Sequence, residues 1–229
     1  MLVPRRLFLA LALSAMASGV SAHSLSELQS ALGNREKYFQ PVDKDASGFT
    51  LADADGHSVK LADFRGKVVV LHFIYTSCPD VCPLHAERIA EIQSLINQSP
   101  MKALVQFVTI TTDPSKDRGN VLRDYGRAHG LDPVNWTFLT TAPEQGEDTT
   151  RNLAQQFVGH AFEKAEDGYQ VHGVVTHVID KEGRWRANFH GLNFDPTNLV
   201  IFVNALTNDV EKPHAHPVPT LWEKLREWF

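Results

Sequence analysis

Two cysteines, Cys78 and Cys82, lie four positions apart in the run TSCPDVCP and are the residues best suited to chemistry. A disulfide stabilises mainly by closing a long loop, so a bridge between such close neighbours would constrain little. Thiolates are soft ligands that favour Cu(I) and zinc, and paired thiols also exchange disulfides. The spacing therefore indicates a redox pair, a metal site or both, and a short disulfide without a function stays open.

The segments on either side predict how the cysteines are positioned. Residues 67–74 form a continuous β-branched and apolar run, which is typical of a strand buried on both faces. Residues 84–98 carry apolar side chains at helical spacing. Because a helix N-terminus stabilises negative charge, we expect at least one thiol to have a lowered pKa. Positions i and i+4 share a helical face, so we expect both sulfurs to reach a common point.

The remaining pattern predicts an α/β domain with a mixed sheet, because strands alternate with helices and then end in a hairpin. A first hairpin is expected around the turn at 53–56, and a tight turn at 181–183 joins the last two strands. Further strands are expected at 103–111, 136–139, 171–180 and 185–190, and helices at about 113–129, 147–158 and 195–206.

The N-terminus has the pattern of a secretory signal peptide over residues 1–22. Arg5 and Arg6 precede the apolar run 7–17, and Val20-Ser21-Ala22 resembles a cleavage site. We therefore expect an exported, periplasmic protein, with an uncleaved membrane anchor as the alternative. Cleavage would change the net charge from −5 to −7. An acidic chain offers no basic surface for nucleic acid, so that class of partner is excluded.

The length suits one domain with a substantial core. We expect an N-terminal arm at 23–47, polar and loosely packed over 23–45, then the domain at 48–208. The tail at 209–229 contains an H-x-H motif and a short amphipathic segment, residues 221–229, that is rich in Trp and Phe.

The run FIYTSCPDVCP, after the hairpin and GKVVVLHF, resembles the Sco (SenC/PrrC-like) copper chaperones. The run TTDPSKD matches the family's Asp-Pro-x-x-Asp segment at Asp113, Pro114 and Asp117, and WTFLT and YQVHGVVTHVIDKEGRW match later segments. The resemblance covers roughly 48–205. It implies a thioredoxin-like fold, a central mixed β-sheet flanked by helices with an N-terminal β-hairpin.

The resemblance implies copper, as Cu(I), Cu(II) or both, bound by Cys78, Cys82 and one histidine. In the family this histidine precedes the turn glycine of the next hairpin by eleven positions, which selects His172 before Gly183. His177 lies where the family commonly has Tyr. On a regular strand, residues five apart point to opposite faces, so His177 is not expected to join His172 as a ligand.

The function implied by the resemblance is that of an exported metallochaperone, not a turnover enzyme. It would deliver copper to the copper centre of cytochrome c oxidase during assembly. The copper-bearing oxidase subunit is the expected partner, with other copper chaperones or a thioredoxin-like reductant as further candidates. A thiol-disulfide oxidoreductase that reduces the oxidase copper-site cysteines, and a copper or redox sensor, remain as alternatives.

Two departures from thioredoxin-type enzymes favour metal binding over general disulfide exchange. Such enzymes have C-x-x-C and a cis-proline before the fourth strand, whereas this chain has C-x-x-x-C and no proline between Pro143 and Pro196. His172 takes the place of that proline. One departure from the Sco pattern is Val171, where the family often has Asp before its ligand.

Other polar residues receive structural interpretations. We expect His85 to be a solvated helix histidine, although it could approach the metal, and His72 to be a core histidine with a hydrogen-bond partner. Asp80 is expected to cap the helix, with docking or tuning as its alternative role.

Residues outside the motif could also bind a metal or a partner. His214 and His216 are read as incidental histidines of a polar tail, with an auxiliary metal site as the alternative. If cleavage follows Ala22, the new N-terminal amine and the imidazole of His23 could chelate copper. Asp113 and Asp117 either cap a helix or contact a partner.

Overall fold

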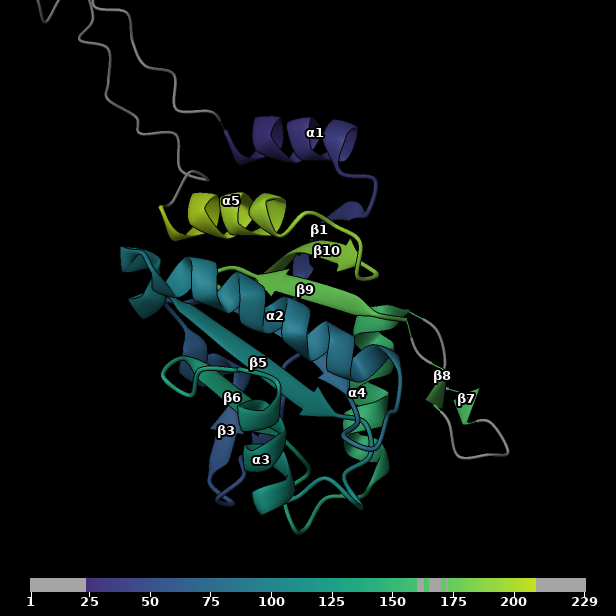
Figure 1. Ribbon diagram of the computed structural model, residues 1–229. Coiled ribbons are helices and arrows are strands. Elements are labelled where there is room, and N and C mark those ends of the chain that lie inside the picture. The colour runs from purple at the N-terminus through teal and green to yellow at the C-terminus, as the bar shows by residue number, and fades with distance from the viewer. Residues whose placement is uncertain (1–23, 160–162, 165–169, 172, 209–229) are drawn as a thin grey trace, which may run out of the picture.

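A six-stranded mixed sheet forms the centre of the computed structural model, which describes residues 24–159, 163–164, 170–171 and 173–208 (Figure 1). Strands β4, β5 and β6 run parallel, β9 is antiparallel to β4, and β10 is antiparallel to both β9 and β1. In spatial order the strands are β1 (Phe39–Asp45), β10 (Arg184–His190), β9 (Val175–Ile179), β4 (Val68–Ile74), β5 (Val105–Thr111) and β6 (Trp136–Leu139).

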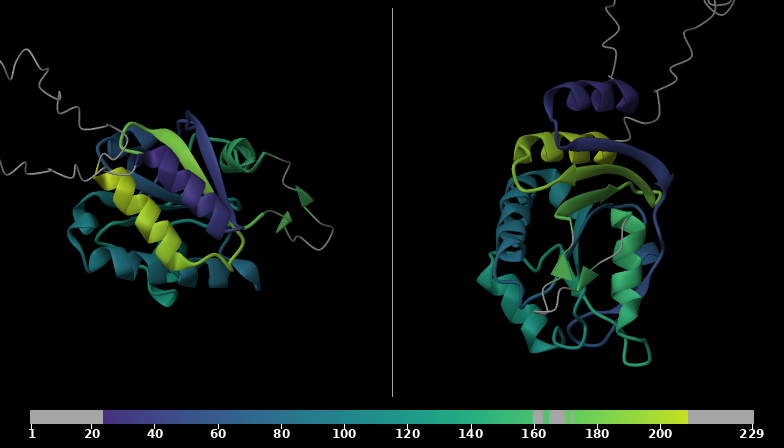
Figure 2. Two further views of the ribbon diagram at one scale, coloured as in Figure 1. Left: turned by 90° about the horizontal axis from the view of Figure 1, so that it is seen from above. Right: turned by 90° about the vertical axis from the view of Figure 1, so that its right-hand side faces the viewer.

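Helices cover both faces of the sheet (Figure 2). One face packs against α2 (Val81–Asn97), α3 (Asn120–Ala128) and α5 (Pro196–Thr207), whose apolar residues share one core cluster. The other face packs against α4 (Asp148–Val158) in a second cluster. Every residue of β4 and β5 is buried, which explains why both strands are rich in apolar residues, although each also buries polar side chains such as His72 and Thr109.

Short elements complete the connections. The hairpin of β2 (Thr50–Ala52) and β3 (Ser58–Lys60) is followed by the 3-10 helix η1 (Leu61–Phe64). A second 3-10 helix, η2 (Pro100–Ala103), follows α2, and β7 (Glu163–Lys164) pairs with β8 (Gln170–Val171). The predicted α/β class, the mixed sheet and the first hairpin are therefore confirmed.

Two predicted elements differ in the structure. The helix expected from about 113 begins only at Asn120, and the segment before it forms a loop. The strand expected over 171–180 is divided, because Gly173 and Val174 belong to no strand and β9 starts at Val175. No regular strand therefore connects positions 172 and 177. The prediction that their side chains point to opposite faces assumed such a strand, so this structure does not support it.

The prediction of a loosely packed arm at 23–45 is wrong for the described part of that segment. Ser24 and Glu27 form a capping box at the start of α1 (Leu25–Arg35), and β1 pairs with β10 in the central sheet. Leu25, Leu32 and Phe39 are buried in the main core. Few apolar residues reveal this packing, since α1 buries only two of its residues and the edge strand β1 buries one.

Glu36 joins the N-terminal elements to the domain. Glu36 is 6% exposed, and its carboxylate accepts hydrogen bonds from the backbone N–H groups of Tyr38 (3.2 Å) and Asp195 (2.9 Å) and from Nδ2 of Asn198 (3.0 Å). Asp195 is the N-cap residue of α5, so the carboxylate lies at a helix N-terminus, where the helix dipole stabilises negative charge. One side chain thereby fixes the α1–β1 corner against α5.

Several sequence predictions lie outside the described residues. They concern the signal peptide at 1–22, the tail at 209–229, and His23, His172, His214 and His216. In the part of the chain that the structure describes, no helix has the length and apolar character needed to cross a membrane.

Replacing Glu36 should destabilise the fold. In Glu36→Gln, an amide NH₂ would face some of the buried donors that the carboxylate now accepts, and an unpaired buried polar group costs about 1–3 kcal/mol. We expect a loss of about 2 kcal/mol in the free energy of unfolding, measured by urea denaturation. Glu91→Gln is the matched control, since Glu91 pairs with Arg88 on the surface and should change stability by less than about 0.5 kcal/mol. An equal effect of both substitutions would contradict this role.

Candidate metal centre

The two cysteines lie where β4 passes into α2. Cys78 belongs to the loop after β4, and Cys82 is the second residue of α2, which begins at Val81. The helix thus starts three residues earlier than predicted, because Pro83 falls in the first turn, where proline is tolerated. The expectation that both cysteines share one helical face is wrong, since Cys78 precedes the helix.

The two sulfurs nevertheless meet, because the loop turns Cys78 back towards the helix. The thiol of Cys82 donates a hydrogen bond to the sulfur of Cys78, which also accepts from the backbone N–H groups of Asp80 and Cys82. Cys78 therefore receives donors that a helix N-terminus leaves without intrahelical partners. Asp80 stands at the N-cap position, but its side chain makes no capping hydrogen bond, so the predicted capping role is wrong.

These contacts shift the pKa values of the two thiols in opposite directions. Burial raises the pKa of Cys78, but the hydrogen bonds from Cys82, from two backbone N–H groups and from the Tyr75 side chain outweigh it, and the pKa falls below its ordinary value. Burial raises the pKa of Cys82. The hydrogen bond that the Cys82 thiol donates to the sulfur of Cys78 raises the pKa of Cys82 further. The predicted thiolate-prone cysteine is therefore Cys78.

A buried carboxylate holds the loop that carries Cys78. Asp117 is fully buried and accepts hydrogen bonds from the backbone N–H of Thr76 (2.9 Å), from the Thr76 hydroxyl and from the Thr111 hydroxyl (2.5 Å). Thr76 follows β4 and Thr111 ends β5, so Asp117 joins the carboxyl ends of two parallel strands. Since α3 begins at Asn120, the predicted capping role is wrong for Asp117.

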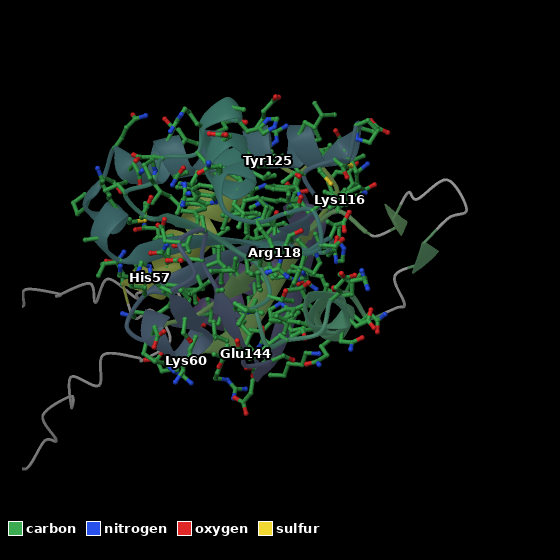
Figure 3. The ribbon with its side chains drawn as sticks, turned by 90° about the horizontal axis from the view of Figure 1, so that it is seen from below. His57, Lys60, Lys116, Arg118, Tyr125 and Glu144 are labelled. Atoms are coloured by element: carbon green, nitrogen blue, oxygen red, sulfur yellow. The ribbon has the colours of Figure 1, made fainter. Side chains whose placement is uncertain are left out.

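The loop between β5 and α3 presents charged groups around this buried carboxylate. Asp113 pairs with Lys116 at 3.3 Å. Arg118 donates to the backbone oxygen of Thr141 (3.0 Å) and to its hydroxyl (2.9 Å), which ties the loop to the segment after β6. Lys116, Arg118 and Tyr125 lie on the same side of the molecule (Figure 3).

Sequence reasoning missed two tyrosines near the sulfurs. The side chain of Tyr75 donates to Cys78, and its position directly before the motif was the available signal. Tyr125 of α3 is 7% exposed, and its hydroxyl finds no hydrogen-bond partner among the described residues. Burial raises the pKa of Tyr125, and the nearby charges of Cys82 and Cys78 raise it further.

A polar cluster lies inside the core beside α2. His72 is fully buried, and its Nε2 contacts the Thr109 hydroxyl at 3.2 Å, which confirms the predicted core histidine with a partner. Burial lowers the pKa of His72 to about 3, so the ring is neutral. His85 is 1% exposed, hydrogen-bonds Thr176 at 2.9 Å, and its ring centroid lies 4.8 Å from that of His72. The prediction of a solvated His85 is therefore wrong.

His177 is a core residue of β9. It is fully buried, its Nδ1 lies 2.7 Å from the Asn188 side-chain oxygen, and its ring contacts Phe157 and Trp185. Burial lowers its pKa to about 3. His172, the predicted third ligand, lies outside the described residues, so its assignment stays a prediction.

A separate acidic group lies on the turn between β2 and β3. Asp53, Asp55 and His57 bring ligating atoms close together, and no other group of three such side chains does so within the residues that the structure describes. Asp53 accepts from the backbone N–H groups of Asp55 and His57, and Asp55 pairs with Arg123. These hydrogen bonds and the ion pair explain why the three side chains lie close together: they stabilise the turn between β2 and β3.

Comparison with known proteins agrees with the architecture. A sequence model of the SCO1/SenC family matches residues 36–207. The SCO2-like protein RP587 of Rickettsia prowazekii is 27% identical over 168 residues, which cover 73% of this chain and 80% of the relative. BsSco, a member of the Sco family of cytochrome c oxidase assembly proteins with a disulfide switch, superposes with a TM-score of 0.65 at 20% identity, over 74% of this chain and 96% of BsSco.

A further solved structure is similar in fold. Yeast Sco1 with copper bound superposes with a TM-score of 0.60 at 20% identity, over 72% of this chain and 90% of the yeast protein. The predicted thioredoxin-like, mixed-sheet fold is thereby confirmed.

The two thiols should react at different rates. Because only the thiolate is nucleophilic, Cys78, with its lowered pKa, should be alkylated at least about ten times faster than Cys82. The measurement treats reduced protein with iodoacetamide between pH 6 and 9 and locates the label by peptide mass spectrometry. The rate at Cys78 should reach its plateau below the ordinary thiol pKa. Faster labelling of Cys82 would reverse the assignment.

Removing the charge of Asp117 should loosen the cysteine loop. In Asp117→Asn one acceptor oxygen becomes an NH₂ group that faces donors, and hydrogen bonds to charged groups contribute about 1.5–3 kcal/mol. We expect about 2 kcal/mol lower unfolding free energy in urea and faster alkylation of Cys78. Asp124→Asn is the matched control and should lower stability by less than about 0.5 kcal/mol, since Asp124 is 68% exposed and pairs with the exposed Arg127 on α3. Unchanged stability in Asp117→Asn would contradict the anchoring role.

Proposed function

The chain belongs to the SCO1/SenC family, and we propose that it binds copper through Cys78, Cys82 and His172 and delivers it to the copper centre of cytochrome c oxidase during assembly. The first part of the proposal concerns metal binding, and the second concerns the recipient. The signal-peptide pattern at 1–22 supports export to the periplasm, where the copper-bearing domain of the oxidase would be accessible.

The contact between the two sulfurs is the observation that carries the proposal. The Cys82 thiol donates directly to Cys78, so both sulfurs lie close enough to share one ion. Cys78 is 6% exposed and Cys82 is 1% exposed, so an ion between them would be held mostly out of water. Soft thiolates in such a site suit Cu(I), and an imidazole as third ligand also suits Cu(II).

The likeness to Sco proteins supports copper as the metal and the oxidase as the recipient. Yeast Sco1 has been solved with copper bound, and BsSco is described as a member of a family of cytochrome c oxidase assembly proteins. In this chain, His72, His85 and His177 are buried in the core and hydrogen-bonded to neighbouring side chains. The segment YQVHGVVTHVIDKEGRW contains two histidines, His172 and His177, and the buried core position of His177 favours His172 as the third ligand.

Disulfide exchange is the second candidate, and the unequal thiols favour it. Cys78, with the lowered pKa, would attack a target disulfide and form a mixed disulfide, releasing one target thiol. Cys82 would then lose its proton and attack Cys78, which releases the second target thiol and leaves an oxidised Cys78–Cys82 pair. The target gains two electrons and the pair loses two, so a reductant such as a thioredoxin-like protein must restore it.

Copper titration tests the metal ligands. Reduced wild-type protein should bind one copper ion and develop a thiolate-to-copper absorption band with Cu(II). In His172→Ala, loss of the third ligand should weaken binding by at least about tenfold and shift the band, since even outer-shell partners of a metal typically contribute 10–100-fold in affinity. Cys78→Ser should abolish the band. His57→Ala, which removes an exposed turn histidine, is the control and should bind as wild type does.

The outcomes separate the candidates. Unchanged affinity and spectrum in His172→Ala would show that the ligand assignment is wrong. A wild-type protein that binds no copper, yet reduces disulfides catalytically, would favour the oxidoreductase over the metallochaperone.

A further inference from the structure

An apolar groove lies between η2 and the C-terminal end of α5, and the proposed copper chemistry does not use it. Its volume is about 430 Å³, and its apolar lining residues include Met101, Leu104, Val200 and Ile201. Leu104 is 39% exposed and Ile201 is 44% exposed, so apolar surface faces solvent at the groove. Polar residues also line the groove, and an exposed apolar patch bordered by polar residues is typical of a binding surface.

The groove adjoins the place where the described domain ends. Thr207 and Asn208, the last described residues, line it themselves. The C-terminal end of α5 lies at the same end of the molecule as the segment after α2 (Figure 1). The chain continues from this point for the twenty-one residues 209–229. Any occupant supplied by that segment would therefore be tethered directly at the groove.

The end of that segment has the sequence of a groove-binding helix. Its apolar residues recur at the spacing i, i+1, i+4, i+7 and i+8, and charged residues occupy the positions between. The apolar residues are Leu221, Trp222, Leu225, Trp228 and Phe229, and the charged ones are Glu223, Lys224, Arg226 and Glu227. A helix this short is marginal alone in water, so its apolar face requires a partner surface.

We propose that the apolar face of residues 221–229 docks in the groove between η2 and α5 of the same chain. The linker 209–220 contains three prolines, and at ~3.1 Å per residue it can span up to roughly 37 Å, more than enough to return to the groove. A tether of this length gives an effective concentration in the millimolar range, so even a weak intrinsic affinity keeps the site occupied.

The observations favour this occupant over a membrane or a second copy. Two acidic and two basic residues give the segment no net charge, whereas helices that bind anionic membranes are rich in Lys and Arg. A second copy would have to compete with a segment that is already attached beside the groove.

The docked segment would lie away from the candidate metal centre. Cys82 is at the first turn of α2, and η2 follows its last turn, so the length of α2, about 25 Å, separates the two sites. The docking proposal is therefore independent of the proposed copper delivery, and it can be tested without any metal.

Photo-cross-linking tests the docking directly. The protein without residues 1–22 carries benzoylphenylalanine in place of Trp222, and irradiated samples are mapped by mass spectrometry. We expect cross-links to residues 99–104 and 200–208 of the same chain. Ile201→Lys should reduce their yield at least about fivefold, because it places a charge in the lining of the groove. Val134→Lys is the matched control, since Val134 is 56% exposed and lies outside the groove, and it should leave the yield unchanged. Urea unfolding of both variants establishes that each is folded.

Three outcomes would overturn the proposal. Cross-links scattered over the surface, or unaffected by Ile201→Lys, would mean that the groove is not the docking site. Mixed-mass products from a mixture of ¹⁵N-labelled and unlabelled chains would identify a second copy as the occupant. Loss of the cross-links with co-sedimentation on phosphatidylglycerol vesicles would identify a lipid surface instead.

Discussion

One buried carboxylate, Asp117, fixes the geometry on which the cysteine site depends. Parallel strands leave their carboxyl ends side by side, and here the ends of β4 and β5 are joined by Asp117 through Thr76 and Thr111. A charge without water is stable only when several donors surround it, so the loops of both strands must adopt one arrangement. These hydrogen bonds also fix the conformation of the cysteine loop, since Cys78 follows Thr76 by two residues.

The N-terminus of α2 forms hydrogen bonds with Cys78, in the loop that Asp117 positions. Helices leave their first backbone N–H groups without partners, and an Asp, Ser or Thr side chain commonly accepts from them. In this chain the exposed Asp80 stands at the capping position without using its side chain, and the sulfur of Cys78 accepts instead. A sulfur in this role gains most as a thiolate, so the local folding of α2 and the acidity of Cys78 have the same cause.

Much of the architecture could be predicted from the sequence, because buried strands and amphipathic helices have distinct periods. The runs at β4 and β5, the helical spacing in α2 and the turn at Gly183 were sufficient signals. The N-terminal helix and strand were missed because α1 and β1 bury few side chains and are held partly by Glu36, which makes contacts far along the chain. The predictions for His85 and Asp117 were wrong for the same reason. The burial of His85 and the hydrogen bonds of Asp117 depend on partners in other elements, which the local sequence does not reveal.

The hydrogen bond between the two thiols relates the two candidate functions. In the reduced protein, the thiol of Cys82 donates a hydrogen bond to the sulfur of Cys78, so the two sulfurs face each other. A copper ion bound there would replace the proton of this hydrogen bond, and metal affinity would rise with pH because binding releases protons. Disulfide exchange would depend on the same difference in pKa. Cys78 would attack first, because its pKa is lowered, and Cys82, whose raised pKa keeps it protonated, would react second. Copper and a target disulfide would therefore compete for the same thiolate, that of Cys78.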